Sequence, residues 1–243
     1  MAIGIFDSGL GGLSVLKQIK LLYPNEKVIY FADSIHLPYG EKTDNQIIQY
    51  SKNICEFLIS KGASSIVIAC NTASSVAYDK LIKIYKIPIY SVIIPVVKYM
   101  LSNNYTKVGL IATRSTVESG KYDKLLNGKL NMKKATPKLV EYAEKLDKIG
   151  IEKVIKNYLD DMVNENEAII LGCTHFPLLN KYLKNIYNDY EFIDPALECA
   201  KSIRIIEHDS GIDEYYTSGD VGQFKTLSKN ILGVDINVRV HKW

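Results

Sequence analysis

The stretch Ile170-Leu171-Gly172-Cys173-Thr174-His175-Phe176-Pro177 ends a short apolar run in a cysteine, a threonine and a histidine. An apolar run that stops at a polar cluster is typical of a buried strand in a parallel sheet. Most unpaired cysteines are small buried apolar side chains, and Cys173 can be interpreted in this way. The alternative is a thiol placed for chemistry at the end of a strand, and the rest of the chain decides between the two.

A second stretch of the chain echoes the first. Ile68-Ala69-Cys70-Asn71-Thr72 also ends an apolar run in a cysteine that polar residues follow. Gly4 precedes Cys70 by 70 − 4 = 66 positions, and Gly109, in a similar apolar context, precedes Cys173 by 173 − 109 = 64 positions. These similar spacings predict a duplicated α/β unit in which each copy ends one strand in a cysteine.

Apolar runs alternate with amphipathic segments along the whole chain. The predicted strands are 2–6, 27–32, 65–69, 89–92, 107–112, 168–171, 191–193 and 236–240. Helical periodicity lies between them, for instance over 12–23, 44–60, 149–163 and 177–186. Repeated alternation of strand and helix indicates an α/β fold, in which parallel sheets are covered by helices.

We expect two pseudo-symmetric lobes, each a mainly parallel sheet flanked by helices, with the active site in the cleft between them. Residues 1–92 with 207–243 are predicted to form the first α/β lobe, and residues 93–206 the second. In such sheets, ligands bind beyond the carboxyl ends of the strands. Polar residues follow four of the predicted strands, namely Asp7-Ser8, Cys70-Asn71-Thr72, Thr113 and Cys173-Thr174-His175. Any one of these could be a helix N-cap, but four together indicate a site.

Composition and charge exclude several classes of protein. The formal net charge is +3 over 243 residues, and the charges are scattered, so we expect no nucleic-acid partner. No stretch approaches the roughly 20 apolar residues of a membrane span, and the first residues lack the pattern of a signal peptide. Four widely spaced cysteines without a Cys-x-x-Cys pair predict neither disulfides nor a metal site. We therefore expect a cytoplasmic protein with no membrane partner.

Two thiols on opposite sides of a shared cleft suit one kind of reaction. A base on one face of a carbon can remove a proton while an acid on the other face returns one, which inverts the centre. A thiol has an ordinary pKa of about 8.5 that its surroundings can tune, so it can serve as either partner. Cys70 and Cys173 therefore predict racemisation by two bases.

The residues beside the two thiols supply what else such a reaction needs. The α-proton of an amino acid is a very weak acid, so hydrogen bonds to the α-carboxylate must stabilise the developing carbanion. Asn71-Thr72 and Thr174-His175 offer hydroxyl, amide and backbone donors at predicted helix starts. Asp7 and His175 are candidates to assist one thiol each. Asp7 can alternatively be interpreted as part of an Asx-type turn before Gly9, and His175 as an ordinary histidine at a helix start.

The glycine-rich stretch Gly9-Leu10-Gly11-Gly12 resembles a dinucleotide-binding loop only in part. It lacks the third glycine of Gly-x-Gly-x-x-Gly, and Asp33 after the next strand does not complete a ribose site. We expect these glycines to let the backbone come close to a small substrate.

Six motifs, in order along nearly the whole chain, resemble those of the glutamate racemases. They are Gly4-Ile5-Phe6-Asp7-Ser8-Gly9-Leu10-Gly11-Gly12-Leu13-Ser14-Val15-Leu16, Pro38-Tyr39-Gly40, Ile68-Ala69-Cys70-Asn71-Thr72-Ala73-Ser74, Ala112-Thr113-x-x-Thr116-Val117-x-Ser119-x-x-Tyr122, Leu171-Gly172-Cys173-Thr174-His175-Phe176-Pro177-Leu178-Leu179 and Tyr216-Thr217-Ser218-Gly219-Asp220.

The resemblance implies an isomerase that interconverts L- and D-glutamate without pyridoxal phosphate or another cofactor and that supplies D-glutamate for peptidoglycan, and so for cell-wall biogenesis and cell shape. It also implies a homodimer. Cys70 and Cys173 would be the paired acid/base residues, with Asp7 and His175 assisting and Glu141 as a further catalytic acid. The implied substrate contacts are Asp7, Ser8, Tyr39, Gly40, Asn71, Thr72, Thr113, Thr116, Thr174 and His175.

Three alternatives stay open at this point. The surroundings of Glu141 depart from the family pattern, so an aspartate-specific or broader amino-acid racemase of the same superfamily is one alternative. A cysteine amidohydrolase would use Cys173 as nucleophile and His175 as base, but the chain has no Gly-x-Cys-x-Gly elbow and Cys70 would have no function. A non-catalytic amino-acid-binding protein would explain the cleft but not the two thiols.

Overall fold

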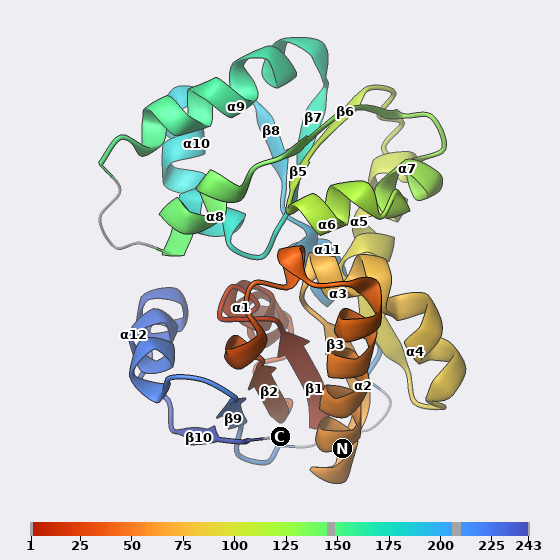
Figure 1. Ribbon diagram of the computed structural model, residues 1–243, viewed down its shortest axis with the longest axis vertical. Helices are drawn as coiled ribbons and strands as arrows, with labels where there is room; N and C mark the ends of the chain where they lie inside the picture. The colour runs from red at the N-terminus through yellow and green to blue at the C-terminus, as the bar shows by residue number, and fades with distance from the viewer. Residues whose placement is uncertain (1, 145–148, 206–209, 243) are drawn as a thin grey trace.

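The computed structural model describes residues 2–144, 149–205 and 210–242, and it shows two α/β lobes, one above the other in Figure 1. The first lobe holds a six-stranded sheet in the order β10-β9-β2-β1-β3-β4, and the second holds a four-stranded sheet in the order β6-β5-β7-β8. Every strand pair in these two sheets is parallel. The predicted fold class of two lobes, each a parallel sheet flanked by helices, is confirmed.

All eight predicted strands are present, each within two residues of its predicted ends, but β6 and β9 are additional. The first sheet consists of β1 (Ala2–Asp7), β2 (Val28–Ala32), β3 (Ala63–Ile68), β4 (Ile89–Ser91), β9 (Glu214–Thr217) and β10 (Val238–Val240). The second consists of β5 (Val108–Ala112), β6 (Leu130–Ala135), β7 (Ala168–Gly172) and β8 (Glu191–Ile193). β6 is not predicted because it is an edge strand with two adjacent lysines and no buried residue, so it contains no apolar run. β9 has the sequence Glu-Tyr-Tyr-Thr, in which no aliphatic residue marks a strand.

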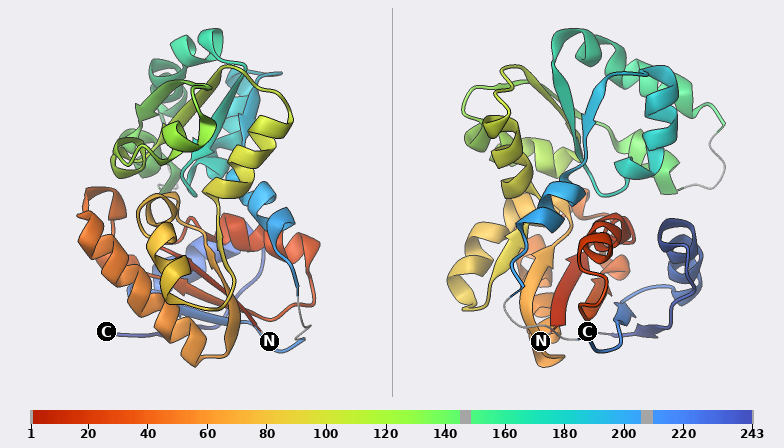
Figure 2. Two further views of the ribbon diagram at one scale, coloured as in Figure 1. Left: turned by 90° about the vertical axis from the view of Figure 1, so that its right-hand side faces the viewer. Right: turned by 180° about the vertical axis from the view of Figure 1, so that it is seen from behind.

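Helices cover both faces of each sheet (Figure 2). In the first lobe and its connections these are α1 (Leu13–Leu22), α2 (Asp44–Ser60), α3 (Asn71–Val76), α4 (Tyr78–Ile84), α5 (Ile93–Ser102), α11 (Pro195–Ser202) and α12 (Val221–Leu232), with the short 3₁₀ turns η1 (Ser34–His36) and η2 (Tyr39–Glu41). The second lobe has α6 (Arg114–Glu118), α7 (Lys121–Leu126), α8 (Pro137–Glu144), α9 (Ile151–Glu165), η3 (Phe176–Leu179) and α10 (Asn180–Ile186). The helix predicted over 44–60 matches α2, which Thr43 and Gln46 begin with a reciprocal capping box. The helix predicted over 177–186 is divided into η3 and α10.

The two sheets repeat one arrangement of strands. β2-β1-β3-β4 of the first corresponds in order to β6-β5-β7-β8 of the second, and in each the cysteine follows the third strand of this order. Gly4 of β1 and Gly109 of β5 occupy the same place. A Cβ there would lie 3.2 Å from Leu58 of α2 and 3.1 Å from Met162 of α9, so the helix that covers each sheet packs directly on a glycine. The arrangement supports the predicted duplication.

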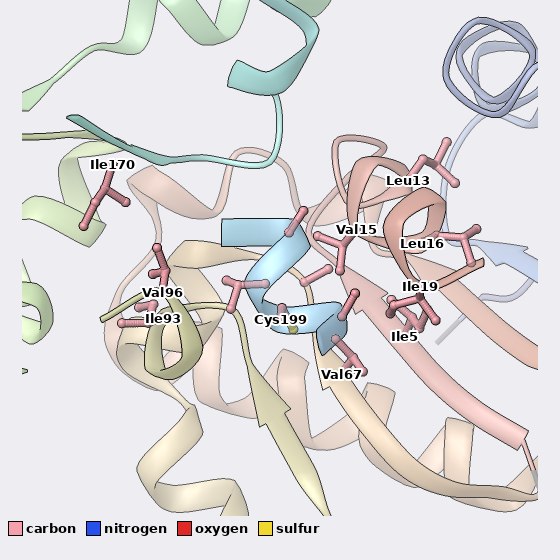
Figure 3. Packing of buried hydrophobic residues seen from close by; sticks show 14 of the residues in the cluster. Ile5, Leu13, Val15, Leu16, Ile19, Val67, Ile93, Val96, Ile170 and Cys199 are labelled. Atoms are coloured by element: carbon pink, nitrogen blue, oxygen red, sulfur yellow. The ribbon is translucent and has the colours of Figure 1, made fainter. Parts of the chain in front are cut away.

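The chain passes between the lobes through α5 and α11, which pack against each other and join the two sheets into one apolar core. Figure 3 shows α11 around Cys199, with Val15 and Ile19 of α1 on one side and Ile93 and Val96 of α5 on the other. The predicted boundary between residues 92 and 93 falls at the start of α5. The boundary between 206 and 207 lies outside the described residues, so the division of the chain into lobes by residue number stays a prediction.

None of the helices in the described part of the chain combines the length and the apolarity that crossing a membrane requires.

Candidate active site

The carboxyl ends of β1 and β3 in the first lobe face the carboxyl end of β7 in the second. Between them lies the glycine-rich loop that follows β1. Its backbone is so close to the second lobe that a Cβ on Gly11 would lie 2.5 Å from Thr174 Oγ1 and 2.9 Å from His175 Nδ1. Only glycine allows so close an approach of the backbone. The glycines are expected to let the loop approach a small substrate, and the structure shows that Gly11 lies against the second lobe.

Cys70 ends the run of β3 and is the N-cap of α3. Its Sγ accepts a hydrogen bond from the Ala73 N–H (3.4 Å) and lies 3.4 Å from Ser8 Oγ. The side chain is 5 % exposed. Burial raises the pKa of the Cys70 thiol to about 12, and the nearby Asp7 carboxylate contributes to the rise. Without a ligand, Cys70 is therefore a neutral thiol at physiological pH.

Cys173 stands at the corresponding place in the second lobe, directly after β7. Its Sγ lies 3.5 Å from His175 Nδ1, and the side chain is 7 % exposed. The Phe176 N–H donates to the Cys173 carbonyl (3.1 Å), which turns the chain into η3. Of the two thiols, Cys173 is therefore the one with an imidazole beside it to exchange protons with.

Asp7 links the two lobes electrostatically. Its Oδ2 accepts the N–H groups of Gly9 (3.1 Å) and Gly12 (3.0 Å), and its Oδ1 accepts a longer hydrogen bond from Thr174 Oγ1 (3.5 Å) of the second lobe. Full burial raises the pKa of Asp7 above its ordinary value, while the nearby His175 and the backbone donors oppose the rise. The Asp7 carboxylate therefore interacts with Thr174 and His175, which follow Cys173, and it also raises the pKa of the Cys70 thiol.

A cluster of hydroxyl groups joins the lobes a short way from the thiols. Thr72 Oγ1 lies 2.8 Å from Thr113 Oγ1 and 3.3 Å from Thr116 Oγ1, and the last two are 3.0 Å apart. Beside it, Tyr122 OH donates to Asn71 Oδ1 (2.8 Å), which fixes the amide with its NH₂ group available. The structure thus brings together the four predicted contacts Asn71, Thr72, Thr113 and Thr116.

Tyr39 and Gly40 reach the same region from η2. Tyr39 is 2 % exposed and packs in one apolar cluster with Cys70. A Cβ on Gly40 would lie 3.2 Å from Thr113 Cβ of the second lobe. Every predicted contact residue, from Asp7 and Ser8 to Thr174 and His175, therefore lies where the lobes meet.

Glu141 is the one predicted residue that the structure does not bring to this place. Its neighbours on α8, Leu139 and Ala143, are buried against η3 and α9, and Glu141 is exposed on the opposite face. Among the described hydrogen bonds, none joins Glu141 to either thiol. Its catalytic role stays a prediction.

Sequence reasoning missed several residues that shape the site. Ser14 Oγ donates to the Thr174 carbonyl (3.2 Å) across the lobes, and Tyr122 orients Asn71. Both lie within motifs that pointed to the family, but nothing local marks their partners. A small cavity behind Cys173 is lined by Ser14, Asn71 and Asp194, among others. Burial raises the pKa of Asp194 to about 6. Among the described residues, no cluster of three or more His, Cys, Asp or Glu side chains is placed to hold a metal ion.

The comparisons with known proteins agree with this geometry. A family model described as Asp/Glu/Hydantoin racemase matches residues 7–203. The chain belongs to this family. The glutamate racemase of Aquifex aeolicus is 37 % identical over 99 % of this chain and 97 % of its own length.

Solved structures of family members share the whole two-lobed fold. The glutamate racemase of Aquifex pyrophilus has a TM-score of 0.85 at 37 % identity, over 99 % of this chain and 98 % of that one. A glutamate racemase isoform of Bacillus anthracis has a TM-score of 0.90 at 30 % identity, over 99 % and 97 %. The Francisella tularensis enzyme, solved in complex with D-glutamate, has a TM-score of 0.87 at 30 % identity, over 100 % and 97 %. The resemblance read from the six motifs is confirmed.

Proposed function

We propose that this protein is a glutamate racemase, an isomerase that interconverts L- and D-glutamate without a cofactor and uses Cys70 and Cys173 as its two acid/base residues. The observation that carries the proposal is the placement of two buried thiols after corresponding strands of two similar lobes, at the place where the lobes meet. Relatives named glutamate racemase match this chain over nearly its whole length, which supports glutamate as the substrate.

In this mechanism, a thiolate removes the α-proton from one face of the substrate and the opposite thiol donates its proton to the other face. The Cα–H electron pair stays on carbon until the new C–H bond forms, and the two thiols exchange protonation states in each turnover. For the reverse reaction the roles are exchanged. Each thiol must therefore return to its starting state before the next molecule reacts.

The two thiols have different routes to the ionised form. Cys173 can pass its proton to His175, whose Nδ1 lies 3.5 Å away. The Cys70 thiol lies 3.4 Å from Ser8 Oγ, and its pKa is raised to about 12 by burial and by the Asp7 carboxylate. The ammonium group of an amino acid placed beside Asp7 would offset that negative charge and lower the pKa of the Cys70 thiol. Substrate binding thus activates Cys70, whereas His175 activates Cys173.

The remaining contacts bind and polarise the substrate. The hydroxyl groups of Thr72 and Thr174 and the Asn71 amide are donors for the α-carboxylate, on which negative charge grows as the proton leaves. Donors fixed in advance stabilise this charge more than water does, because they need no reorientation. Tyr122 and Ser14 hold two of these donors in place.

The wider role follows from the reaction. A glutamate racemase supplies D-glutamate for peptidoglycan in the cytoplasm, and thereby supports cell-wall biogenesis and cell shape. We propose that the protein works as a homodimer, and that residues 1–92 with 207–243 and residues 93–206 form its two lobes.

A panel of L- and D-amino acids followed by chiral chromatography tests this function. We expect turnover of both glutamate enantiomers, in a preparation without an absorption band of pyridoxal phosphate. Faster turnover of aspartate would identify an aspartate racemase of the same family. Ammonia released from glutamine without racemisation would identify an amidohydrolase, and tight glutamate binding without turnover would identify a binding protein.

A further inference from the structure

The turn formed by Tyr39 and Gly40 is anchored by a fully buried carboxylate, Asp33. Asp33 directly follows β2 and has no solvent exposure. Its Oδ2 accepts hydrogen bonds from Tyr39 OH (2.6 Å) and His36 Nδ1 (2.8 Å), and its Oδ1 accepts one from Ser218 Oγ (2.9 Å). A buried carboxylate is costly unless donors surround it, and here it has them.

These donors come from separate parts of the chain. His36 belongs to η1 and stacks on Tyr50 of α2 with ring centroids 3.8 Å apart. Ser218 follows β9, which is 185 positions further along, and its Oγ also accepts the Ile35 N–H (3.0 Å). Asp33 therefore ties the segment between β2 and α2 to the end of β9.

The other side of the same turn meets the proposed site with little room. The Tyr39 ring packs in the cluster that includes Cys70. A Cβ added to Gly40 would lie 3.2 Å from Thr113 Cβ of the second lobe. Because the turn contacts both lobes, a shift of the turn changes its contacts with each of them. Burial and then the Asp33 carboxylate raise the pKa of the Tyr39 phenol well above its ordinary value, so Tyr39 keeps its proton and stays a donor.

We propose that Asp33 is a positioning residue for racemisation, which fixes the Tyr39–Gly40 turn between Cys70 and Thr113 through its hydrogen bonds from Tyr39 and Ser218. Asp33 itself does not touch the substrate in this arrangement. It acts through the Tyr39–Gly40 turn, which lies between Cys70 and Thr113, and the segment at Ser218 helps to hold that turn. The inference rests on the proposed function, because it assigns a role within that site.

Three variants separate the hydrogen bonds from the packing around them. Tyr39→Phe and Ser218→Ala each remove one donor to Asp33 and keep most of the side-chain volume. Asp33→Asn keeps the shape of the carboxylate, but an amide cannot accept all of its hydrogen bonds. Tyr216→Phe is the matched control, because Tyr216 OH also donates to a carboxylate, Glu214, at 2.6 Å in the same lobe.

The informative readout is the split between KM and kcat for each glutamate enantiomer. A misplaced turn weakens substrate binding, so we expect KM to rise about 3- to 10-fold in Tyr39→Phe and Ser218→Ala and more in Asp33→Asn. Loss of folded protein lowers kcat and leaves KM unchanged, so a merely structural role would not raise KM. Tyr216→Phe is expected to keep the wild-type KM.

The proposal is overturned if Tyr39→Phe and Ser218→Ala keep KM within 1.5-fold of the wild type, or if only kcat falls, in proportion to the folded fraction measured by circular dichroism. The wild type, assayed in parallel, separates this result from a failure of the proposed function. If the wild type does not turn over glutamate, the glutamate assignment fails, and KM is then compared for the amino acid that the wild type does racemise.

Discussion

The close approach of the two lobes at Gly11 predicts a large effect from one added methyl group. In Gly11→Ala the new Cβ would lie 2.5 Å from Thr174 Oγ1, and ordinary contact begins at 3.4 Å, so the gap must widen by 3.4 − 2.5 = 0.9 Å. The backbone of Gly11 lies outside the left-handed region, so alanine adds contact without backbone strain. Overpacking of this kind costs about 1 to 3 kcal/mol.

The lobes can relieve this contact by separating, so the cost falls on the closed arrangement rather than on folding. We therefore expect kcat/KM for glutamate to fall about 5- to 150-fold, since about 1.4 kcal/mol corresponds to a factor of ten. Chiral chromatography of both directions measures the rates, and thermal unfolding measures stability, which should change little.

Gly222→Ala is the control for this prediction. Gly222 lies in α12, where an added Cβ would meet only the exposed Asp220 side chain, 3.1 Å away. We expect near wild-type kinetics and a small change in stability, because alanine favours helix while the new Cβ lies close to the N-cap oxygen, Asp220 Oδ1. A Gly11→Ala variant with kcat/KM within twofold of the wild type would show that close approach of the lobes is not needed for the reaction.

Three further predictions concern buried groups. Burial raises the pKa of three thiols, Cys55, Cys70 and Cys199, to about 12. Between pH 9 and pH 12 the unfolded chain therefore loses thiol protons that the folded protein keeps. Thermal melts should show the stability falling by about 1.4 kcal/mol per thiol for each pH unit. Asp194→Asn keeps the N-cap of α11 but removes a carboxyl group whose pKa is raised to about 6. It should stabilise the protein by about 1 to 3 kcal/mol at pH 7, where the buried carboxyl is ionised, and by almost nothing at pH 4. No gain at pH 7 in urea titrations would refute this. Tyr122→Phe leaves Asn71 Oδ1 unpaired and should lower kcat/KM about 10-fold with a stability loss of about 1 to 2 kcal/mol, and wild-type kinetics would show that this orientation is unimportant.

Sequence patterns predict most of the fold because its strands are buried on both faces. Strands such as β1, β2 and β5 consist almost wholly of buried residues, and continuous apolar runs identify them. β6 lies at the edge of its sheet with polar side chains exposed, so no such run exists. Its place is decided by pairing with β5, which the local sequence does not show.

The site is predictable to the extent that strand ends mark it. Asp7 is the last residue of β1, Cys70 lies two positions after the end of β3, and Thr113 and Cys173 directly follow β5 and β7. Parallel sheets bring residues at such positions to one edge. The network around Asp33 is different, because its hydrogen bond with Ser218 joins residues 185 positions apart. Only the three-dimensional packing of β9 beside β2 creates that contact, so the motifs could mark both segments but not their partnership.

The central claim is that each thiol serves one face of the substrate. The most direct measurement incubates the variants Cys70→Ala and Cys173→Ala with each pure glutamate enantiomer in ²H₂O and follows both inversion and deuterium at Cα. Since each variant retains a base on one side only, we expect neither to invert the centre and each to exchange the α-proton of a single enantiomer, opposite for the two variants. Interconversion of the enantiomers by both variants at near wild-type rates would contradict the two-thiol mechanism.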